Sequence, residues 1–226
     1  MTQVVENRDG ILARIAKARA SAVHPAAATR LIAVSKFHGA EPCRALLAAG
    51  QRDFGENRVQ EALAKWPDLK RDFPDLVLHM IGPLQTNKVH EAVGLFDVIQ
   101  SLDRPKLLSA LKAATDKAGR CPRLFVQVNI GDEPQKSGIA IEAAPAFVAD
   151  VRAAFGDRLE GLMCIPPLDK PPAPYFALMR KLADEAGLSC LSMGMSDDFE
   201  TAVAFGATHV RVGTAIFGPR PYPKQP

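Results

Sequence analysis

The sequence predicts an α/β fold, a single (β/α)8 barrel of the TIM type with an extra N-terminal helix. From Arg30 onward, short β-branched apolar runs alternate with longer Ala- and Leu-rich stretches of helical spacing. The rhythm is nearly regular, at roughly 20 to 30 residues per unit. No GxGxxG turn follows the first apolar run, which counts against an open doubly wound sheet, the alternative fold.

The two ends of the chain are expected to lie outside the repeating units. Val4, Ile11 and Ile15 recur at near-helical spacing among charged residues, which predicts an amphipathic helix within residues 1–25. The last residues, 219–226, are rich in proline and are expected to form an extended tail. At 226 residues, the chain is long enough for one large core, so residues 1–226 are expected to form one domain.

Strand–helix–strand crossovers place consecutive strands parallel and side by side, and eight such units close most naturally into a barrel. Two of the expected helices, at 41–50 and 174–187, end in Gly50 and Gly187, which can take the left-handed conformation that stops a helix. The strands are expected at 30–36, 52–57, 77–82, 96–102, 122–130, 159–165, 190–196 and 209–217.

Composition and charge exclude several classes of protein. Lys and Arg number 28 against 25 Asp and Glu, a net charge of +3, and the charges are interspersed, so the sequence shows no nucleic-acid footprint. The N-terminus lacks the apolar stretch of a signal peptide or membrane span, which predicts no membrane association. The four cysteines are widely spaced and form no CxxC pair: Cys43, Cys121, Cys164 and Cys190. We therefore expect free thiols, no metal site and a cytoplasmic location.

Lys36 is the first candidate for chemistry, because the polar residues that matter in a parallel barrel lie at the carboxyl ends of its strands. It follows the apolar run 31–34, so its amine is expected to be partly desolvated and therefore to favour the neutral form that attacks an aldehyde. By itself, a lysine in this position is also typical of a surface charge whose stem packs on apolar residues.

The seventh and eighth strands end in residues that suit a phosphate. Gly194 and Gly213 permit close backbone approach, Ser196 and Thr214 offer hydroxyl donors, and Ser196-Asp197-Asp198 is expected to cap the next helix with its free amides toward an anion. We call Ser196, Gly213 and Thr214 the phosphate cup. A lysine and a phosphate cup on adjoining strands predict a site for a phosphorylated aldehyde, and pyridoxal phosphate is the obvious one. Alternatively, Ser196 only caps a helix and the two glycines only turn the chain.

Motifs along nearly the whole chain resemble those of the pyridoxal phosphate homeostasis proteins, whose barrel is similar to the N-terminal domain of bacterial alanine racemase. In this order and combination they are highly specific. They are AVSK (33–36), FGENRVQEALAK (54–65), HMIGPLQTNK (79–88), KSGI (136–139), GLMCIPP (161–167), SMGMSDD (192–198) and VRVGTAIFG (210–218).

The resemblance implies that Lys36 bonds the cofactor aldehyde as a Schiff base and that the phosphate cup, with backbone near Met195, holds the phosphate. It places Arg211 beside the pyridine nitrogen, where a permanent cation disfavours a protonated ring and weakens the electron sink. The remaining cofactor-binding residues that it implies, on the second, third and seventh strands, are Asn57, His79 and Ser192. For His79, a core histidine with satisfied hydrogen bonds is the alternative.

Two features at the expected mouth differ from the family pattern or lack an assigned role. Lys36 is followed by Phe37-His38-Gly39 instead of a small polar residue and a lysine, and Leu78 stands where a tryptophan is common. Lys136, in the KSGI motif, can accept the aldehyde by imine exchange, and the alternative is an ordinary solvated loop lysine.

The function expected from these residues is binding, buffering and delivery of pyridoxal phosphate in vitamin B6 homeostasis, without catalysis. A racemase needs a tyrosine opposite the lysine, and neither Tyr175 nor Tyr222 lies at an expected strand end. The alternatives are a slow racemase or other Schiff-base enzyme that uses Lys36, and a sugar-phosphate aldolase with Glu56 as its acid or base. The expected partners are enzymes that lack their pyridoxal phosphate, and the expected assembly is a monomer or weak homodimer.

Overall fold

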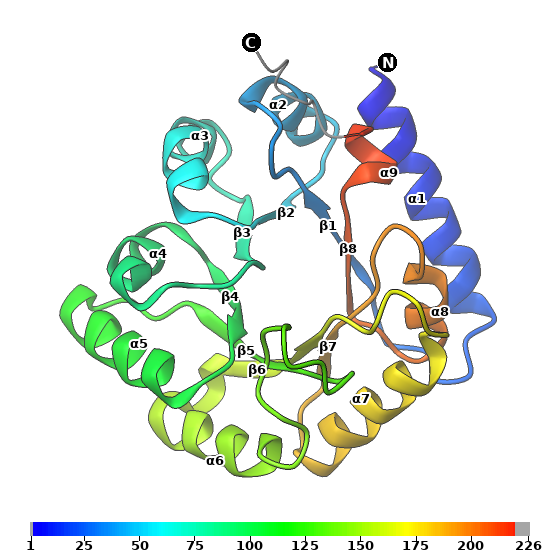
Figure 1. The fold of residues 1–226 in the computed structure, drawn as a ribbon. Helices are drawn as coiled ribbons and strands as arrows, with labels where there is room; N and C mark the ends of the chain where they lie inside the picture. The colour runs from blue at the N-terminus through cyan, green and yellow to red at the C-terminus, as the bar shows by residue number, and fades with distance from the viewer. Residues whose placement is uncertain (1, 220–226) are drawn as a thin grey trace.

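The computed structural model describes residues 2–219 as a closed barrel of eight parallel strands with helices around it (Figure 1). Each strand pairs with its neighbours in sequence, and β1 closes the ring by pairing with β8, with Arg30 opposite His209 and Ala33 opposite Val212. The strands are β1 (Arg30–Val34), β2 (Asp53–Glu56), β3 (Val77–Met80), β4 (Val98–Leu102), β5 (Arg123–Val128), β6 (Leu159–Cys164), β7 (Cys190–Ser192) and β8 (His209–Val212). The predicted fold class is confirmed.

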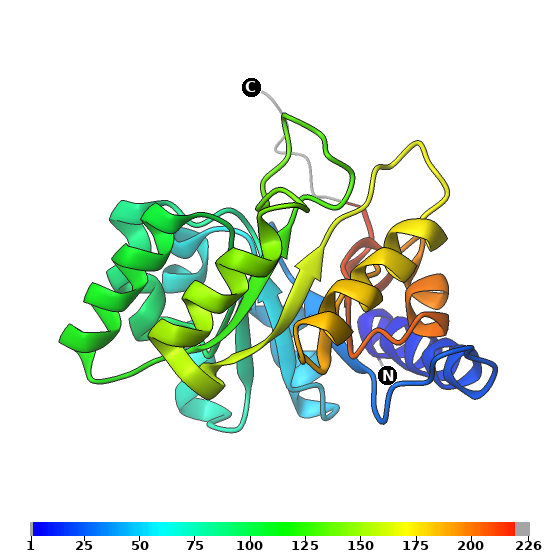
Figure 2. The same ribbon diagram turned by 90° about the horizontal axis from the view of Figure 1, so that it is seen from below.

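The crossover segments form helices that cover the outside of the barrel, as Figures 1 and 2 show from two sides. Their apolar faces and the outward faces of the strands bury large side chains such as Trp66 and Phe176. The helices are α2 (Ala40–Ala48), α3 (Val59–Asp72), α4 (Val89–Leu95), α5 (Pro105–Ala118), α6 (Ala144–Phe155), α7 (Ala173–Glu185), α8 (Phe199–Ala204) and α9 (Thr214–Phe217), with short 3-10 turns at Thr86–Lys88 and Gly156–Arg158.

Two predicted helix ends are confirmed. Gly50, with φ of 93°, follows α2, and Gly187, with φ of 62°, follows α7. A residue with a Cβ is strained in this left-handed region, so glycine stops both helices at low cost.

The N-terminal helix α1 (Gln3–Ala20) packs against the last two helices, α8 and α9 (Figure 1). Asn7 donates a hydrogen bond to the Ile216 carbonyl at 2.9 Å, and Arg14 makes a two-pronged contact with Glu200 at 2.8 and 3.1 Å. Helix α1 therefore supports the elements that follow the seventh and eighth strands. No helix among residues 2–219 combines the length and apolarity needed to cross a membrane.

The eighth strand was predicted to run through residue 217, and this prediction is wrong beyond Val212. The chain turns at Gly213 and forms the single-turn helix α9, whose Ile216 and Phe217 amides bond the Gly213 carbonyl at 2.9 Å each. The run 214–217 is apolar because it packs beside α1, and its apolarity alone does not distinguish strand from helix. The predicted tail, 219–226, lies outside the described residues except for Pro219.

Candidate functional site

A cavity of about 310 Å³ opens at the carboxyl ends of the strands, the face where the loops after β5 and β6 rise above the barrel (Figure 2). It joins residues that lie far apart in the sequence, because β1 and β8 are neighbours in the closed ring. Its lining includes seven of the predicted cofactor-binding residues: Lys36, Asn57, Met195, Ser196, Arg211, Gly213 and Thr214. The other two, His79 and Ser192, are buried in the barrel interior and do not line it.

Lys36 lies two residues after the end of β1 and is half-buried on the cavity wall. The backbone turns sharply after it, with Phe37 at φ of 68°, a conformation that a bulky side chain disfavours. The Phe37 amide donates to the Glu61 carboxylate at 2.5 Å, and the Ser35 amide donates to the Gly55 carbonyl at 3.1 Å. Contacts on both sides of Lys36 therefore hold this turn in its strained shape.

A buried ion pair lies behind the turn. Lys65 Nζ is 2.6 Å from Glu56 Oε1, and the two side chains are 6% and 0% exposed. The same ammonium group donates to the backbone carbonyls of Ser35 and His38, at 2.8 Å each. Lys65 therefore joins the two ends of the segment that carries Lys36.

Glu56 does not lie where the aldolase alternative needs it. Its carboxylate is buried away from the cavity lining and accepts hydrogen bonds from the Ser35 hydroxyl at 2.7 Å and Trp66 Nε1 at 3.1 Å. Burial raises the pKa of Glu56, although Lys65 acts in the opposite direction. Glu56 is thus a structural partner of Lys65 and not an acid or base at the mouth.

The three residues of the phosphate cup come together on the side of the cavity formed by β7 and β8. Gly213 lies against β1, where a Cβ would be 3.2 Å from the Val34 carbonyl oxygen. Thr214 begins α9, so its amide belongs to the first turn, where amides have no partner within the helix. Two hydroxyls and such amides suit an anion.

The predicted cap, Ser196-Asp197-Asp198, meets α8 at its last residue. Asp198 stands at the N-cap position, but its side chain bonds none of the helix amides. The Asp198 carboxylate instead accepts from the Met195 amide at 2.6 Å, while the Met195 carbonyl accepts from the Phe199 amide at 2.9 Å. The Met195 amide, expected to assist with the phosphate, thus has an internal partner.

Arg211 lines the cavity from β8 and is held from behind. Its Nη1 donates to Ser192 Oγ at 2.8 Å and its Nη2 donates to the Cys164 carbonyl at 2.9 Å. Burial lowers the pKa of Arg211, but a guanidinium keeps its charge in proteins. Ser192 therefore orients Arg211 and does not itself reach the cavity lining.

His79 was expected beside the ligand at a strand end, and the structure places it within the barrel. It is 1% exposed, and its ring nitrogens contact Asp53 Oδ1 and Gln100 Nε2 at 3.0 Å each. Burial lowers the pKa of His79, against the opposing effect of Asp53. These contacts match the alternative of a core histidine with satisfied hydrogen bonds. Asn57 does reach the cavity lining, from the residue after β2.

Lys136 lies outside the cavity lining, in the loop after β5. Its Nζ is 2.6 Å from Glu133 Oε2 and donates to the Pro166 carbonyl at 3.0 Å. Pro166 adjoins Ile165, which lines the cavity. The amine therefore ties the loops after β5 and β6 together at the edge of the mouth.

The sequence did not single out His38 as a site residue, although it lines the cavity. Its ring stacks on Phe217, with centroids 5.0 Å apart. Burial lowers the pKa of His38, and Lys65 lowers it further. Its position two residues after Lys36 was the available signal, but the stacking partner lies on α9, which had been predicted as a strand.

No cysteine is among the residues that line the cavity. All four cysteines are free, and burial raises the pKa of Cys164 to about 12. Residues 2–219 contain no group of three or more His, Cys, Asp or Glu side chains that could hold a metal ion.

Fold and site together define a class, the (β/α)8 barrels that present a lysine from the first strand beside hydroxyls and glycine from the last two. The model of the family described as alanine racemase, N-terminal domain, matches residues 7–221. A pyridoxal phosphate homeostasis protein from Pseudomonas aeruginosa is 43% identical over 228 residues, 98% of each chain. The chain belongs to the alanine racemase N-terminal domain family and, within it, to the pyridoxal phosphate homeostasis proteins.

Solved structures of PipY from Synechococcus elongatus PCC7942 share the fold. The form without pyridoxal phosphate has a TM-score of 0.80 and 42% identity, covering 91% of this chain and 98% of PipY. The form with pyridoxal phosphate bound has a TM-score of 0.79 and 39% identity, covering 96% of this chain and 100% of PipY.

Proposed function

We propose that this protein binds pyridoxal phosphate as a Schiff base on Lys36 and buffers and delivers it in vitamin B6 homeostasis. The observation that carries the proposal is one cavity that combines Lys36, the phosphate cup and Arg211. The names of the relatives and the pyridoxal phosphate bound to PipY support it.

The residues fit the cofactor chemically. Pyridoxal phosphate supplies an aldehyde for a lysine, a ring nitrogen and a phosphate dianion. Lys36 provides the amine, the phosphate cup provides hydroxyl donors, and Arg211 provides a fixed cation for the ring nitrogen. Asn57 adds an amide on the same wall, so each polar part of the cofactor has a suitable partner.

Two features favour a carrier over a racemase. Arg211 donates hydrogen bonds and cannot accept a proton, so it keeps the ring nitrogen unprotonated and the electron sink weak. Tyr175 lies on α7, outside the barrel, and does not line the cavity, while Tyr222 lies outside the described residues. We therefore place no second base opposite Lys36.

The setting that we propose is the cytoplasm, where free thiols persist. The proposed partners are enzymes that lack their pyridoxal phosphate, and the proposed assembly is a monomer or weak homodimer. Lys136 is proposed to lie near the path of the departing cofactor, because it bonds Pro166 next to the cavity-lining Ile165.

Lys36→Ala is expected to abolish covalent binding. Adding pyridoxal phosphate to the natural protein should give an imine absorption band that borohydride reduction fixes onto the peptide containing Lys36. The variant should show neither band nor adduct, while Lys106→Ala, which changes an exposed lysine on α5, should behave as the natural protein does. An adduct on another lysine, or no band in the natural protein, would refute the assignment.

The loaded protein is expected to transfer cofactor without racemising amino acids. Mixing it with an aminotransferase that lacks its cofactor should restore that enzyme's activity, whereas L-alanine should racemise no faster than with free pyridoxal phosphate. Chiral chromatography measures the second rate. Racemisation at about a hundredfold or more above free cofactor would show that Lys36 acts with a second base.

A further inference from the structure

A continuous chain of side-chain hydrogen bonds crosses the barrel interior from Arg211 to Asp53. Arg211 Nη1 lies 2.8 Å from Ser192 Oγ, which lies 2.7 Å from Gln100 Oε1. Gln100 Nε2 lies 3.0 Å from His79 Nδ1, and His79 Nε2 lies 3.0 Å from Asp53 Oδ1. We call this series of bonds the Arg211–Asp53 chain. Its members lie on five different strands of the barrel: Arg211 on β8, Ser192 on β7, Gln100 on β4, His79 on β3 and Asp53 on β2.

The chemistry of the two ends, together with a neutral His79 ring, determines the direction of every bond. A guanidinium only donates, so Ser192 Oγ accepts from Arg211 and its own proton goes to the Gln100 oxygen. That contact turns the Gln100 amide so that its NH2 group faces His79 Nδ1, which must then be the unprotonated nitrogen. His79 Nε2 therefore carries the proton and donates to the Asp53 carboxylate. All donors point from the cation toward the anion.

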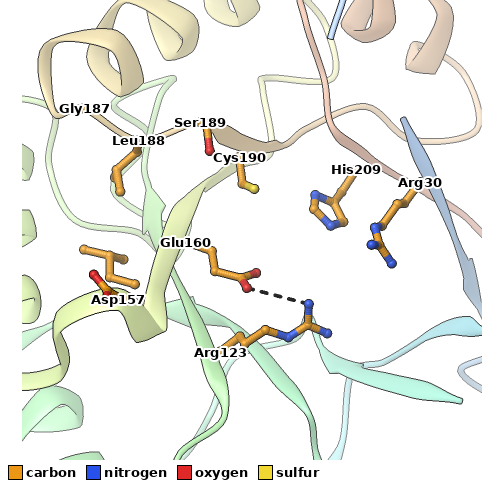
Figure 3. A pocket seen from close by; sticks show the side chains of 10 residues that line it. Arg30, Arg123, Asp157, Glu160, Gly187, Leu188, Ser189, Cys190 and His209 are labelled. Carbon is orange, nitrogen blue, oxygen red and sulfur yellow. Dashed lines mark ion pairs between the residues drawn. The ribbon is translucent and has the colours of Figure 1, made fainter. Parts of the chain in front are cut away.

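The middle of the Arg211–Asp53 chain is buried from bulk solvent. Ser192 and Gln100 are 0% exposed and His79 is 1% exposed, so a broken bond would leave a buried polar group without a partner. A second cavity of about 400 Å³ lies at the amino ends of the strands, and Figure 3 shows Arg30, Arg123 and His209 around it. Arg30 lies 3.8 Å from Asp53 there.

Burial, and not the charged carboxylates around it, favours the neutral His79 ring that the Arg211–Asp53 chain needs. Asp53 on β2 and Asp97 before β4 favour a proton on His79, while Arg123 on β5 opposes it. His209 on β8 lies with its ring centroid 6.2 Å away, and burial lowers the pKa of His209 to about 3. Burial outweighs the carboxylates and lowers the pKa of His79.

We propose that Ser192, Gln100, His79 and Asp53 are positioning residues that hold the Arg211 guanidinium in one orientation at the cavity wall. The inference rests on the proposed function for its ligand, because Arg211 is the cation assigned to the ring nitrogen. The geometry of the chain itself does not depend on any ligand.

The first test uses the protein without ligand. Long-range ¹H–¹⁵N correlation spectra at neutral pH should show His79 protonated at Nε2 alone. Gln100→Leu should change the Nδ1 signal and broaden or average the Arg211 side-chain NH signals. A proton on Nδ1, or Arg211 signals identical in the variant, would overturn the chain even if pyridoxal phosphate binds as proposed.

The second test compares dissociation constants for pyridoxal phosphate, each divided by that of the natural protein at the same pH. Gln100→Leu should weaken binding about tenfold at every pH, because the Ser192 hydroxyl loses its acceptor and no longer fixes Arg211 in one orientation. Ser101→Ala is the matched control on the same strand, since its buried hydroxyl has no hydrogen-bond partner among the described residues. A ratio near one for both variants would overturn the proposal.

Gln100→Glu keeps the shape of the side chain and adds a pH readout that a merely structural role would not produce. At pH 6 one proton between the new carboxylate and His79 Nδ1 keeps the chain intact, so the ratio should stay near one. At pH 9.5 that proton is lost, two acceptors face each other, and the ratio should rise several-fold. A ratio independent of pH would overturn the proposal. Failure of the natural protein to bind pyridoxal phosphate would refute the proposed function instead.

Discussion

Lys65→Met is expected to lower the free energy of unfolding by about 3 to 5 kcal/mol, the usual cost of breaking a buried ion pair by removing one partner. The variant leaves the Glu56 carboxylate without its cation in a site where it is 0% exposed. It also removes the donor to the Ser35 and His38 carbonyls, so the strained turn at Phe37 loses the contact that joins its ends. Urea unfolding followed by circular dichroism measures the change.

The loss of stability in Lys65→Met should be larger at high pH than at low pH. Burial raises the pKa of Glu56 in the folded protein, and without Lys65 that pKa rises further, so the variant regains stability when the carboxyl is protonated. A folded-state pKa above the unfolded value means stability present at low pH and lost as pH rises through the folded pKa. The difference between the variant and the natural protein should therefore be largest near pH 8 and smaller near pH 5.

Lys70→Met is the matched control, because it makes the same substitution on the same helix, α3. Lys70 pairs with Asp97 at 2.6 Å at a partly exposed site, and Arg120 also contacts Asp97, at 2.9 Å. Loss of the Lys70 ion pair should lower the free energy of unfolding by about 1 kcal/mol or less. Equal stability of the two variants would show that the Lys65 ion pair is not the anchor of the turn.

The sequence was sufficient for the barrel because its repeats are short-range signals. Most strands are short apolar runs, and Gly50 and Gly187 mark helix ends through backbone conformation alone. The prediction of a strand over 214–217 was wrong because this run packs against α1, at the other end of the chain. Periodicity cannot separate a strand from one helical turn over four residues.

The candidate site was predictable where a residue's place depends only on its strand. Lys36, Ser196, Gly213 and Thr214 reach the cavity because they follow strand ends. His79 did not, because strand residues alternate between the interior and the helices, and its interior partners, among them Gln100, come from other strands. The ion pair between Glu56 on β2 and Lys65 on α3 was also missed, because no local sequence pattern predicts a contact between a strand and the helix that packs on it.

Removing both hydroxyls of the phosphate cup, with Ser196→Ala and Thr214→Val together, is expected to weaken pyridoxal phosphate binding about a hundredfold or more. Each hydroxyl is proposed to donate to a phosphate dianion, and such charge-assisted bonds are individually worth roughly 1.5 to 3 kcal/mol. Both residues are at least partly exposed on the cavity wall, so the changes leave no buried polar group unpaired. Titration followed by the imine band gives the dissociation constants.

Pyridoxal, which has the aldehyde and ring but no phosphate, separates an effect on the phosphate from an effect on the fold. If the hydroxyls act only on phosphate, the double variant and the natural protein should bind pyridoxal within about twofold of each other. The loss seen with pyridoxal phosphate then measures the cup itself. An equal loss with both ligands would mean that Ser196 and Thr214 shape the wall around Lys36 and that the phosphate is held elsewhere, which would contradict the assignment of the cup to β7 and β8.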